Sequence, residues 1–323
     1  MKVIDDFNPS IFVRQADVQT VWPTLFRKVT GFDYKRERIT TPDDDFLDLD
    51  WAYTSGKTKK LVIVSHGLEG NTGRHYVKGM VKHFLTHGWD ALAWNFRGCS
   101  GEPNRQAGFY HSGASYDLRT VINHVLKATS YDHIALVGFS MGGNITLKYL
   151  GEESGYVSSR VRSAMAFSVP VDLTTAAVKM ARFRCKGYMQ YFLKKLHKKI
   201  KAKQERYPDL LNDDGYSQIK TFKQFDDRYT APLHGFRDAE DYWQQSSALK
   251  FMTHIKLPTV LINAKDDPFL SLQCFPSEAE IRNENVQILA TKHGGHVGFW
   301  TQFSKPFWSE KTALKWSDYH SEK

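Results

Sequence analysis

Residues 133–149, which read HIALVGFSMGGNITLKY, restrict the fold of this chain more than any other stretch. The apolar run at 134–137 is typical of a strand that is buried on both faces. It ends at a G-x-S-x-G motif, residues 138–142, after which apolar residues recur at helical spacing from 143 to 150. A strand, a sharp turn and a helix together form the context in which this motif presents a nucleophilic serine.

The residues around Ser140 suit this chemistry. A serine on a strained strand-to-helix turn needs neighbours without a Cβ atom, and glycines stand two residues away on each side, at Gly138 and Gly142. Ser140 would lie at the positive end of the following helix, where the N–H group of Met141 is free to bind an oxyanion. We therefore predict that Ser140 is a nucleophile.

A second oxyanion donor is predicted in the segment HGLEGN at 66–71, directly after the apolar strand 61–64. In α/β-hydrolases a loop at this position supplies the second N–H group. Gly67 allows the turn that would point the N–H group of Leu68 at the reaction centre. His66 and Glu69 are interpreted as residues that brace this loop, with a catalytic base at His66 as the alternative.

The remaining elements alternate in the order of a mostly parallel sheet. Two strands, 35–40 and 46–52, form a predicted antiparallel hairpin at the sheet edge. Strands and helices then alternate, and residues 1–33 are expected to form an irregular lead-in that packs across the domain. This order requires right-handed crossovers and helices on both faces of the sheet. The later predicted segments are helix 76–85, strand 91–96, helix 114–127 and strand 164–169.

The loop that follows strand 91–96 contains two further reactive side chains, Arg97 and Cys99. This loop falls at the carboxyl end of a parallel strand, where open α/β sheets keep their sites. Arg97 could steer an anionic substrate, but we interpret it as a residue that braces the loop. Cys99 has no base at a recognisable spacing, so we do not predict it as a nucleophile.

From residue 172 to 248 the alternation stops, and the chain becomes helical and strongly basic. Between residues 179 and 206 there are eleven Lys or Arg residues and a single acid, Glu205. Apolar residues recur at spacings of three and four, which predicts an apolar stripe that packs on the protein. We expect residues 172–248 to form a cap over the site that shapes an acyl pocket. The stripe comprises Met189, Phe192, Leu193, Leu196 and Ile200, opposite Lys194, Lys195, Lys198 and Lys199.

A basic amphipathic helix has a second interpretation, because such a helix can lie on an anionic membrane surface. Solvated lysines opposite a packed apolar face are the more ordinary arrangement. Transient contact of the basic cap with an anionic membrane is therefore a hypothesis. Binding to nucleic acid is not expected, because the basic stretch has no recognised nucleic-acid module.

The partners of the serine are predicted in two loops near the end of the chain. The strand at 258–264 leads into Asp266 and Asp267, and the strand at 286–290 leads into His293 and His296. Acyl transfer needs a base for the serine proton and a carboxylate to orient that base. We favour His296 over His293, because small residues flank it, and Asp267 over Asp266, because Pro268 stiffens the loop after it.

Taken as a set, several segments resemble the YheT-type branch of the α/β-hydrolases. The likeness runs from about residue 7 to 310, and it includes Asp17-Val18-Gln19-Thr20, where His is expected in place of Asp17. The quoted segments are HGLEGN at 66–71, NFRGCSGEPNR at 95–105, GFSMGGN at 138–144, NAKDDPF at 263–269, GGHVGF at 294–299, and Phe225-Asp226-Asp227.

The resemblance implies hydrolysis of carboxylic esters through a triad of Ser140, Asp267 and His296. Leu68 and Met141 would supply the oxyanion N–H groups, and neither a metal nor another cofactor is expected. Thioesters or amides are alternative substrates for the same triad. A further alternative is a protein that keeps the fold without catalysis and binds a membrane surface or a partner.

Composition sets the expected domain organisation and environment. The chain has 323 residues, 41% of them hydrophobic, and a formal net charge of +9. We expect one catalytic domain, with core segments at 1–171 and 249–323 around the cap at 172–248. The N-terminal residues lack the apolar region of a signal peptide, which predicts a soluble cytoplasmic protein. The three cysteines, Cys99, Cys185 and Cys274, are expected to be reduced thiols.

Overall fold

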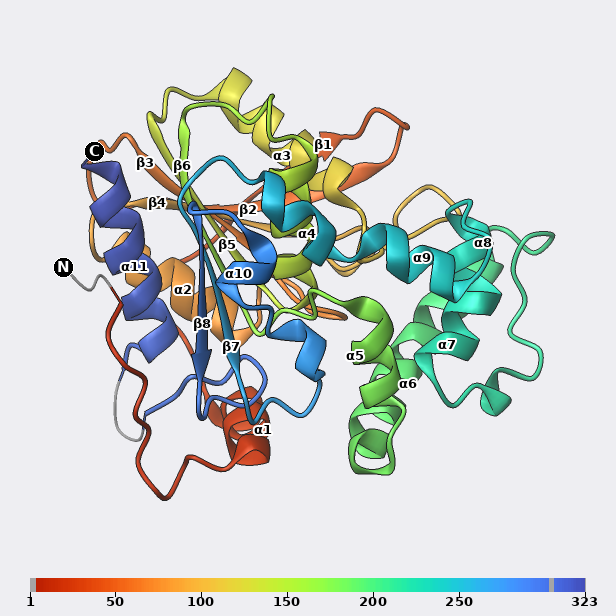
Figure 1. The fold of residues 1–323 in the computed structure, drawn as a ribbon. Coiled ribbons are helices and arrows are strands. Elements are labelled where there is room, and N and C mark those ends of the chain that lie inside the picture. Colours follow the sequence, from red (N-terminus) through yellow and green to blue (C-terminus); the bar gives the residue numbers. More distant parts are fainter. Residues whose placement is uncertain (1–3, 302–304, 323) are drawn as a thin grey trace.

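An eight-stranded sheet forms the centre of the molecule in the computed structural model (Figure 1). The structure describes residues 4–301 and 305–322, so small parts of the predicted lead-in and second core segment, 1–3, 302–304 and 323, lie outside the described residues. The strand order is β1-β2-β4-β3-β5-β6-β7-β8. The strands are β1 (Lys35–Thr40), β2 (Phe46–Ala52), β3 (Lys60–Ser65), β4 (Asp90–Asn95), β5 (His133–Phe139), β6 (Val161–Phe167), β7 (Thr259–Ala264) and β8 (Val286–Thr291).

The sheet is mostly parallel, as the alternation of elements predicts. Strands β3 to β8 pair in parallel, whereas β1 and β2 form the predicted antiparallel hairpin and β2 joins β4 antiparallel. Because every parallel strand points the same way, their carboxyl ends lie at one edge of the sheet. The loops with Leu68, Ser140, Asp267 and His296 all leave the sheet at this edge.

Helices cover both faces of the sheet, and each face has its own apolar core. On one face, α2 (His75–Leu85) and α11 (Trp308–Ser321) pack against each other and on the strands. On the other face lie α3 (Ser115–Ala128) and α4 (Met141–Glu152) (Figure 1). Neighbouring residues of β3 alternate between the two cores, which is the period of a buried strand.

Between β6 and β7 the chain leaves the sheet and forms a helical segment beside it, at the right of Figure 1. We call residues 172–248 the cap segment. It is helical, and the apolar stripe of its long helix is buried at Met189, Leu193, Leu196 and Ile200. The elements are α5 (Leu173–Met180), α6 (Lys186–Gln204), α7 (Phe222–Phe225), a π-helix (Asp226–Thr230), α8 (Ala231–Leu233) and α9 (Ala239–Ser246).

The prediction of an irregular lead-in is wrong for part of residues 1–33, because α1 (Ala16–Phe26) is a helix. The side chain of Gln15 caps it by accepting a hydrogen bond from the Val18 N–H group at 2.7 Å. Its buried residues are Ala16, Gln19 and Pro23, whereas Trp22, Leu25 and Phe26 are exposed, so the packed face has no stripe of large apolar side chains. Short 3-10 turns (Phe183–Cys185, Tyr216–Gln218, Ala248–His254, Leu272–Cys274) and α10 (Glu278–Ile281) complete the described elements.

None of the helices within residues 4–301 and 305–322 combines the length and apolar character that a membrane span requires.

Candidate active site

Ser140 lies on the turn between β5 and α4 in a strained conformation, with φ 53° and ψ −120°. Its amide donates to the Phe167 carbonyl of the neighbouring strand at 2.8 Å, which fixes the turn to the sheet. A Cβ atom at Gly138 would lie 2.6 Å from the Gly142 carbonyl oxygen, and one at Gly142 would meet the carbonyl oxygens of Ser65 and His66. Both glycines are therefore required by close backbone contacts.

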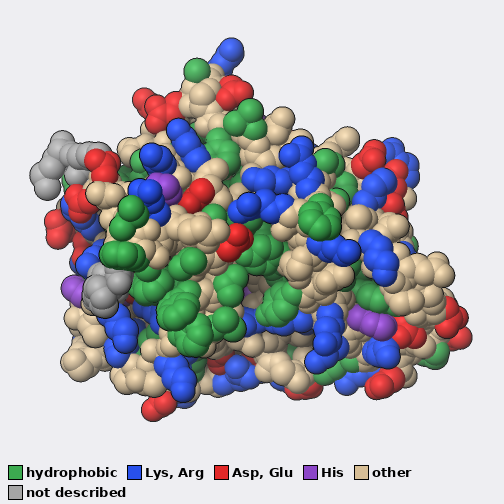
Figure 2. All heavy atoms as spheres, turned by 90° about the horizontal axis from the view of Figure 1, so that it is seen from below, with side chains coloured by type: hydrophobic (Ala, Val, Ile, Leu, Met, Phe, Trp, Pro, Cys, Tyr) green, Lys and Arg blue, Asp and Glu red, His purple; other side chains and the backbone are tan. Residues whose placement is uncertain are grey.

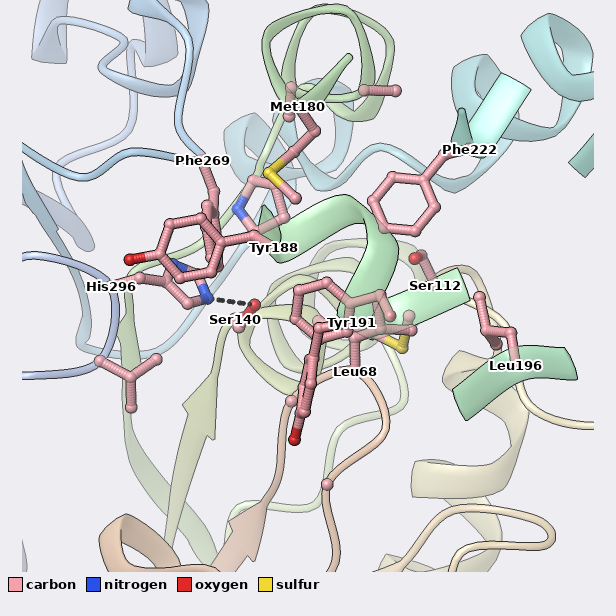
Figure 3. Close-up of a pocket in the computed structure, with 18 of the residues that line it drawn as sticks. Leu68, Ser112, Ser140, Met180, Tyr188, Tyr191, Leu196, Phe222, Phe269 and His296 are labelled. Carbon is pink, nitrogen blue, oxygen red and sulfur yellow. Dashed lines mark hydrogen bonds between the residues drawn. The ribbon is translucent and has the colours of Figure 1, made fainter. Parts of the chain in front are cut away.

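Three side chains form a continuous chain of hydrogen bonds at the carboxyl edge of the sheet. The Nε2 atom of His296 lies 2.9 Å from the Oγ atom of Ser140, as the dashed line in Figure 3 marks. The Nδ1 atom of His296 lies 2.9 Å from Oδ2 of Asp267, whose side chain has no exposed surface. Because a carboxylate only accepts hydrogen bonds, Nδ1 carries the proton and Nε2 can accept the serine proton.

The two competing residues lie together, away from the serine. His293 Nδ1 is 3.5 Å from Asp266 Oδ2, and Asp266 also accepts a hydrogen bond from the Gly295 amide at 2.9 Å. Asp266 therefore braces the loop before His296. The structure brings Asp267 and His296 to Ser140, and it does not bring Asp266 and His293 there.

Residues distant in sequence fix the histidine loop. The amide of His296 donates to Thr20 Oγ1 of α1 at 2.9 Å, and the amide of Val297 donates to Ser168 Oγ at 2.8 Å. The aromatic ring of Phe269 lies against the imidazole, with ring centroids 4.3 Å apart. These contacts restrict the imidazole to one orientation and shield it from one side.

The two predicted oxyanion donors lie beside Ser140. Within the described part of the chain, the amides of Leu68 and Met141 donate to no other group. Met141 is the first residue of α4, so its amide has no acceptor within the helix. Leu68 lies next to Ser140 in Figure 3, on the loop after β3. A Cβ atom at Gly67 would lie 3.2 Å from Ser140 Cβ, which shows how closely this loop approaches the serine.

His66 braces that loop, and both of its ring nitrogens are hydrogen-bonded to backbone groups and not to the serine hydroxyl. Its Nδ1 atom lies 2.8 Å from the Gly67 carbonyl, and its Nε2 atom accepts a hydrogen bond from the Phe96 amide at 3.1 Å. Complete burial lowers the pKa of His66 to about 3, so the ring is neutral. Nδ1 therefore donates to Gly67 while Nε2 accepts.

Glu69 has the bracing contacts expected from the sequence. Its carboxylate accepts from the Tyr110 hydroxyl at 2.6 Å, and its amide donates to the same hydroxyl oxygen at 3.0 Å. Its carbonyl accepts from Arg74 and from Lys195. The loop with Leu68 is thus held from the core and from the cap segment at once.

Arg97 and Cys99 take no part in the site. The Arg97 guanidinium is buried and pairs with Asp117 of α3 and with Asp43 of the β1–β2 turn, so it braces its loop as expected. Burial raises the pKa of the Cys99 thiol to about 12, which leaves it without thiolate character. Asp172 and Asp238 cap helices α5 and α9 with their side chains.

A pocket of about 590 Å³ opens beside the serine, and most of its lining is apolar. Ser140 and His296 lie at one side of it, while Phe222 and Leu196 of the cap segment lie across the pocket (Figure 3). The wall includes α1 as well as α5, α6 and α7. One carboxyl group, that of Asp226, also borders the pocket.

Asp226 is buried in the π-helix and hydrogen-bonded to two side chains. Thr230 Oγ1 lies 2.6 Å from its Oδ1 atom, and Trp243 Nε1 donates to its Oδ2 atom at 2.9 Å. Burial raises the pKa of Asp226 to about 7, so near neutral pH the carboxyl group is partly protonated.

The expectation that the lysines of α6 are solvated is wrong for some of them. Lys195 donates to the Glu69 carbonyl at 3.1 Å, and Lys199 donates to the Gly98 carbonyl. Lys203 is buried and donates to the carbonyls of Asn104 and Gln106, and burial lowers its pKa to about 8. Helix α6 is therefore fixed to the core loops by its lysines as well as by its apolar stripe.

Four residues that support the site are not predicted as site residues from the sequence: Thr20, Ser168, Phe269 and Asp226. Asp226 and Phe269 lie in motifs quoted above, but only the fold shows that they line the same pocket as Ser140. Thr20 lies in the quoted segment Asp17-Val18-Gln19-Thr20, and that segment was the one available signal for the contact with His296. No sequence signal marks Ser168.

This chain is similar to known proteins over most of its length. The family model described as the alpha/beta hydrolase fold matches residues 60–303. The protein named "Putative esterase YheT" of Escherichia coli is 34% identical over 96% of this chain and 92% of its own length. Phospholipase ABHD3 of Mus musculus is 26% identical over 92% of this chain and 74% of its own length.

Solved structures show the same fold. The Pyrococcus furiosus esterase Pf2001 is 21% identical, covers 92% of this chain and 95% of its own, and superposes with a TM-score of 0.57. The strand order, the position of the serine turn and the match of the family model over most of the chain are all those of this fold. The chain therefore belongs to the α/β-hydrolase fold family, in the branch that contains YheT.

Proposed function

We propose that this protein is a serine hydrolase that cleaves carboxylic esters with an apolar acyl group. The observation that carries the proposal is the hydrogen-bonded chain from Ser140 through His296 to Asp267, beside a largely apolar pocket. This is the set of groups that acyl transfer by a serine requires. The names of the relatives, an esterase and a phospholipase, support ester substrates.

In the proposed reaction, Ser140 Oγ attacks the ester carbonyl carbon while its proton moves to His296 Nε2. The carbonyl oxygen becomes an oxyanion, and the amides of Leu68 and Met141 donate hydrogen bonds to it. When the tetrahedral intermediate collapses, the C–O bond to the alcohol breaks and the alkoxide takes the proton from Nε2. Water then repeats these steps on the acyl-enzyme and releases the acid.

The cap segment, residues 172–248, would set the acyl specificity. Its helices supply the apolar wall across the pocket from Ser140, including Met180, Leu196 and Phe222. Core elements hold the chemical groups, so the cap can determine which acyl chain fits without altering the triad.

The first test is active-site labelling with a fluorophosphonate probe, together with hydrolysis of p-nitrophenyl esters of increasing acyl length. We expect wild-type protein to be labelled and to show an optimum at a medium or long chain. Ser140→Ala should abolish labelling and lower turnover by about 10⁴- to 10⁶-fold.

The two adjacent aspartates provide a matched pair of variants for the same assay. Asp267→Asn should lower turnover by about 10⁴-fold, because the amide favours the wrong imidazole tautomer. Asp266→Asn should cost less than about tenfold, because Asp266 contacts the Gly295 amide and not His296. Absence of labelling in folded wild-type protein, or equal losses in the two Asp variants, would overturn the assignment.

A further inference from the structure

The entrance of the pocket lies between helix α1 and the start of α6. Val21, Leu25 and Tyr191 line the pocket and are also exposed large hydrophobic side chains, so they mark the point where it meets solvent. A substrate must pass between these residues to reach Ser140.

The apolar surface extends beyond the entrance. On α1, Trp22 and Phe26 are 48% and 58% exposed and their rings lie against each other, with centroids 4.2 Å apart. On the cap segment, Phe183 is 89% exposed, next to Arg184, whose guanidinium lies 3.3 Å from Asp17 of α1. The part of this surface on α1 and the part on the cap segment are therefore adjacent. We call this surface the mouth collar: Val21, Trp22, Leu25, Phe26, Phe183 and Tyr191.

Basic residues lie beside the mouth collar on its cap side. Arg182, Arg184 and Lys186 flank Phe183 in the cap segment, and all three are exposed. The acid between the two halves, Asp17, is occupied by Arg184 and by the Tyr188 hydroxyl. Figure 2 shows this lower face of the molecule, with hydrophobic side chains gathered in its middle and Lys and Arg side chains around them.

We propose that the mouth collar docks on an anionic lipid surface, from which the apolar substrate enters the pocket directly. An apolar patch with aromatic residues at its centre and cations at its rim matches the interface of such a surface. The collar is continuous with a largely apolar pocket, so a lipid chain would remain in apolar surroundings along its path. A second copy of the chain on this face would instead close the entrance. The identity of the lipid as an ester substrate rests on the proposed function.

Helix α1, which carries part of the mouth collar, is in direct contact with the loop that carries His296. On its buried side, Gln19 donates to the Trp300 carbonyl and accepts from the Trp300 amide, while Thr20 accepts from the His296 amide. One face of α1 therefore carries the collar while the other positions the histidine. Docking would bring the lipid surface to the site without a rearrangement of the core.

Co-sedimentation with vesicles tests the docking separately from the chemistry, because it uses Ser140→Ala protein. The vesicles contain phosphatidylcholine alone or phosphatidylcholine with about one third phosphatidylserine. We expect preferential binding to the anionic vesicles. Adding Trp22→Ser and Phe26→Ser should lower the partition coefficient at least about tenfold. Tyr156→Ser is the matched control, since Tyr156 is 89% exposed but precedes β6, at the opposite edge of the sheet.

The charge of the rim is tested by Arg182→Glu together with Lys186→Glu. This variant should bind anionic vesicles at least about tenfold more weakly, and its residual binding should depend less on salt than that of the parent protein. The variant and the parent protein should differ much less in their binding to neutral vesicles.

Activity measurements complete the test in the Ser140-containing protein. Trp22→Ser with Phe26→Ser should lower hydrolysis of esters presented in anionic vesicles at least about tenfold. It should leave probe labelling and hydrolysis of a soluble short-chain ester within about twofold. Failure of probe labelling with intact vesicle binding would refute the esterase and leave the docking in place.

Two results would overturn the docking proposal. The first is equal vesicle binding by the collar variant and the Tyr156→Ser control. The second is a wild-type dimer, seen by analytical ultracentrifugation, that the collar variant converts to a monomer while neither protein binds vesicles. In that case the collar is an interface between two copies of the chain.

Discussion

Among single residues, Asp226 shows how burial can give a carboxyl group an unusual protonation state. It borders an apolar pocket, and its two hydrogen-bond partners, Thr230 and Trp243, are neutral side chains. Desolvation raises its pKa, and the nearby carboxylate of Asp227 acts in the same direction. The group is therefore stabilised as the neutral acid.

This raised pKa predicts a pH dependence of stability. The pKa of Asp226 rises from 3.8 to about 7 on folding, so between these values the folded state holds a proton that the unfolded state has lost. The free energy of unfolding therefore falls as the pH rises through this range, with a contribution of up to about 1.4 kcal/mol per pH unit. Asp226→Asn should remove this contribution, because the amide stays neutral.

Urea denaturation at a series of pH values checks this prediction. Asp226→Asn and wild type should have similar stability near pH 4, and the variant should be the more stable protein at pH 8. Asp214→Asn, at an exposed aspartate of the same segment, is the control. A constant stability difference between Asp226→Asn and wild type at all pH values would contradict the assignment.

At the scale of elements, the sequence predicts the sheet well but not α1. Strands such as β3 and β5 are runs of apolar residues that end at glycine motifs, and their pattern is local. Helix α1 turns its large apolar residues to solvent and buries Gln19 among backbone groups of the histidine loop. The exposed face of α1 is therefore its apolar face, which is the reverse of an ordinary amphipathic helix. For this reason the spacing of its apolar residues does not predict how the helix packs.

The same reasoning applies to the site. The serine turn and the loops with Leu68, Asp267 and His296 are each marked by a short motif, so they could be predicted. The contacts of Lys199 and Lys203 with core carbonyls could not, because a lysine run looks like a solvated face until the fold is known. Long-range contacts such as Thr20 with His296 have no local pattern at all.

Helix α6 supplies the prediction at this scale. Leu196 lies across the pocket from Ser140, so a larger side chain there should shorten the pocket without touching the triad (Figure 3). Leu196→Trp should lower kcat/KM at least about tenfold for long-chain p-nitrophenyl esters and much less for the acetate. Leu210→Trp, at an exposed position after α6, is the control. A uniform loss at all chain lengths would contradict a specificity role.

At the scale of the whole molecule, the two ends of the chain hold each other and thereby hold α1. Lys315 of α11 pairs with Asp5, and Trp308 Nε1 donates to the Asp5 carbonyl. Arg27, the residue after α1, forms a bidentate ion pair with Glu310 at 2.6 and 3.0 Å, and both side chains are almost fully buried. The helix that bears the mouth collar and supports His296 is thus anchored on the last helix of the fold.

Because of this anchor, the single variant at Arg27 should lose more stability than the double variant at Arg27 and Glu310. Arg27→Met should lower the free energy of unfolding by about 3–5 kcal/mol, because it leaves the Glu310 carboxylate buried without its cation. Adding Glu310→Gln should recover a large part of that loss, since the amide can still accept from the Phe307 amide, 2.9 Å from Glu310 Oε2 in wild type. Urea denaturation of the four proteins in the cycle gives the coupling energy. Strictly additive effects would mean that the ion pair does not anchor α1 on the last helix.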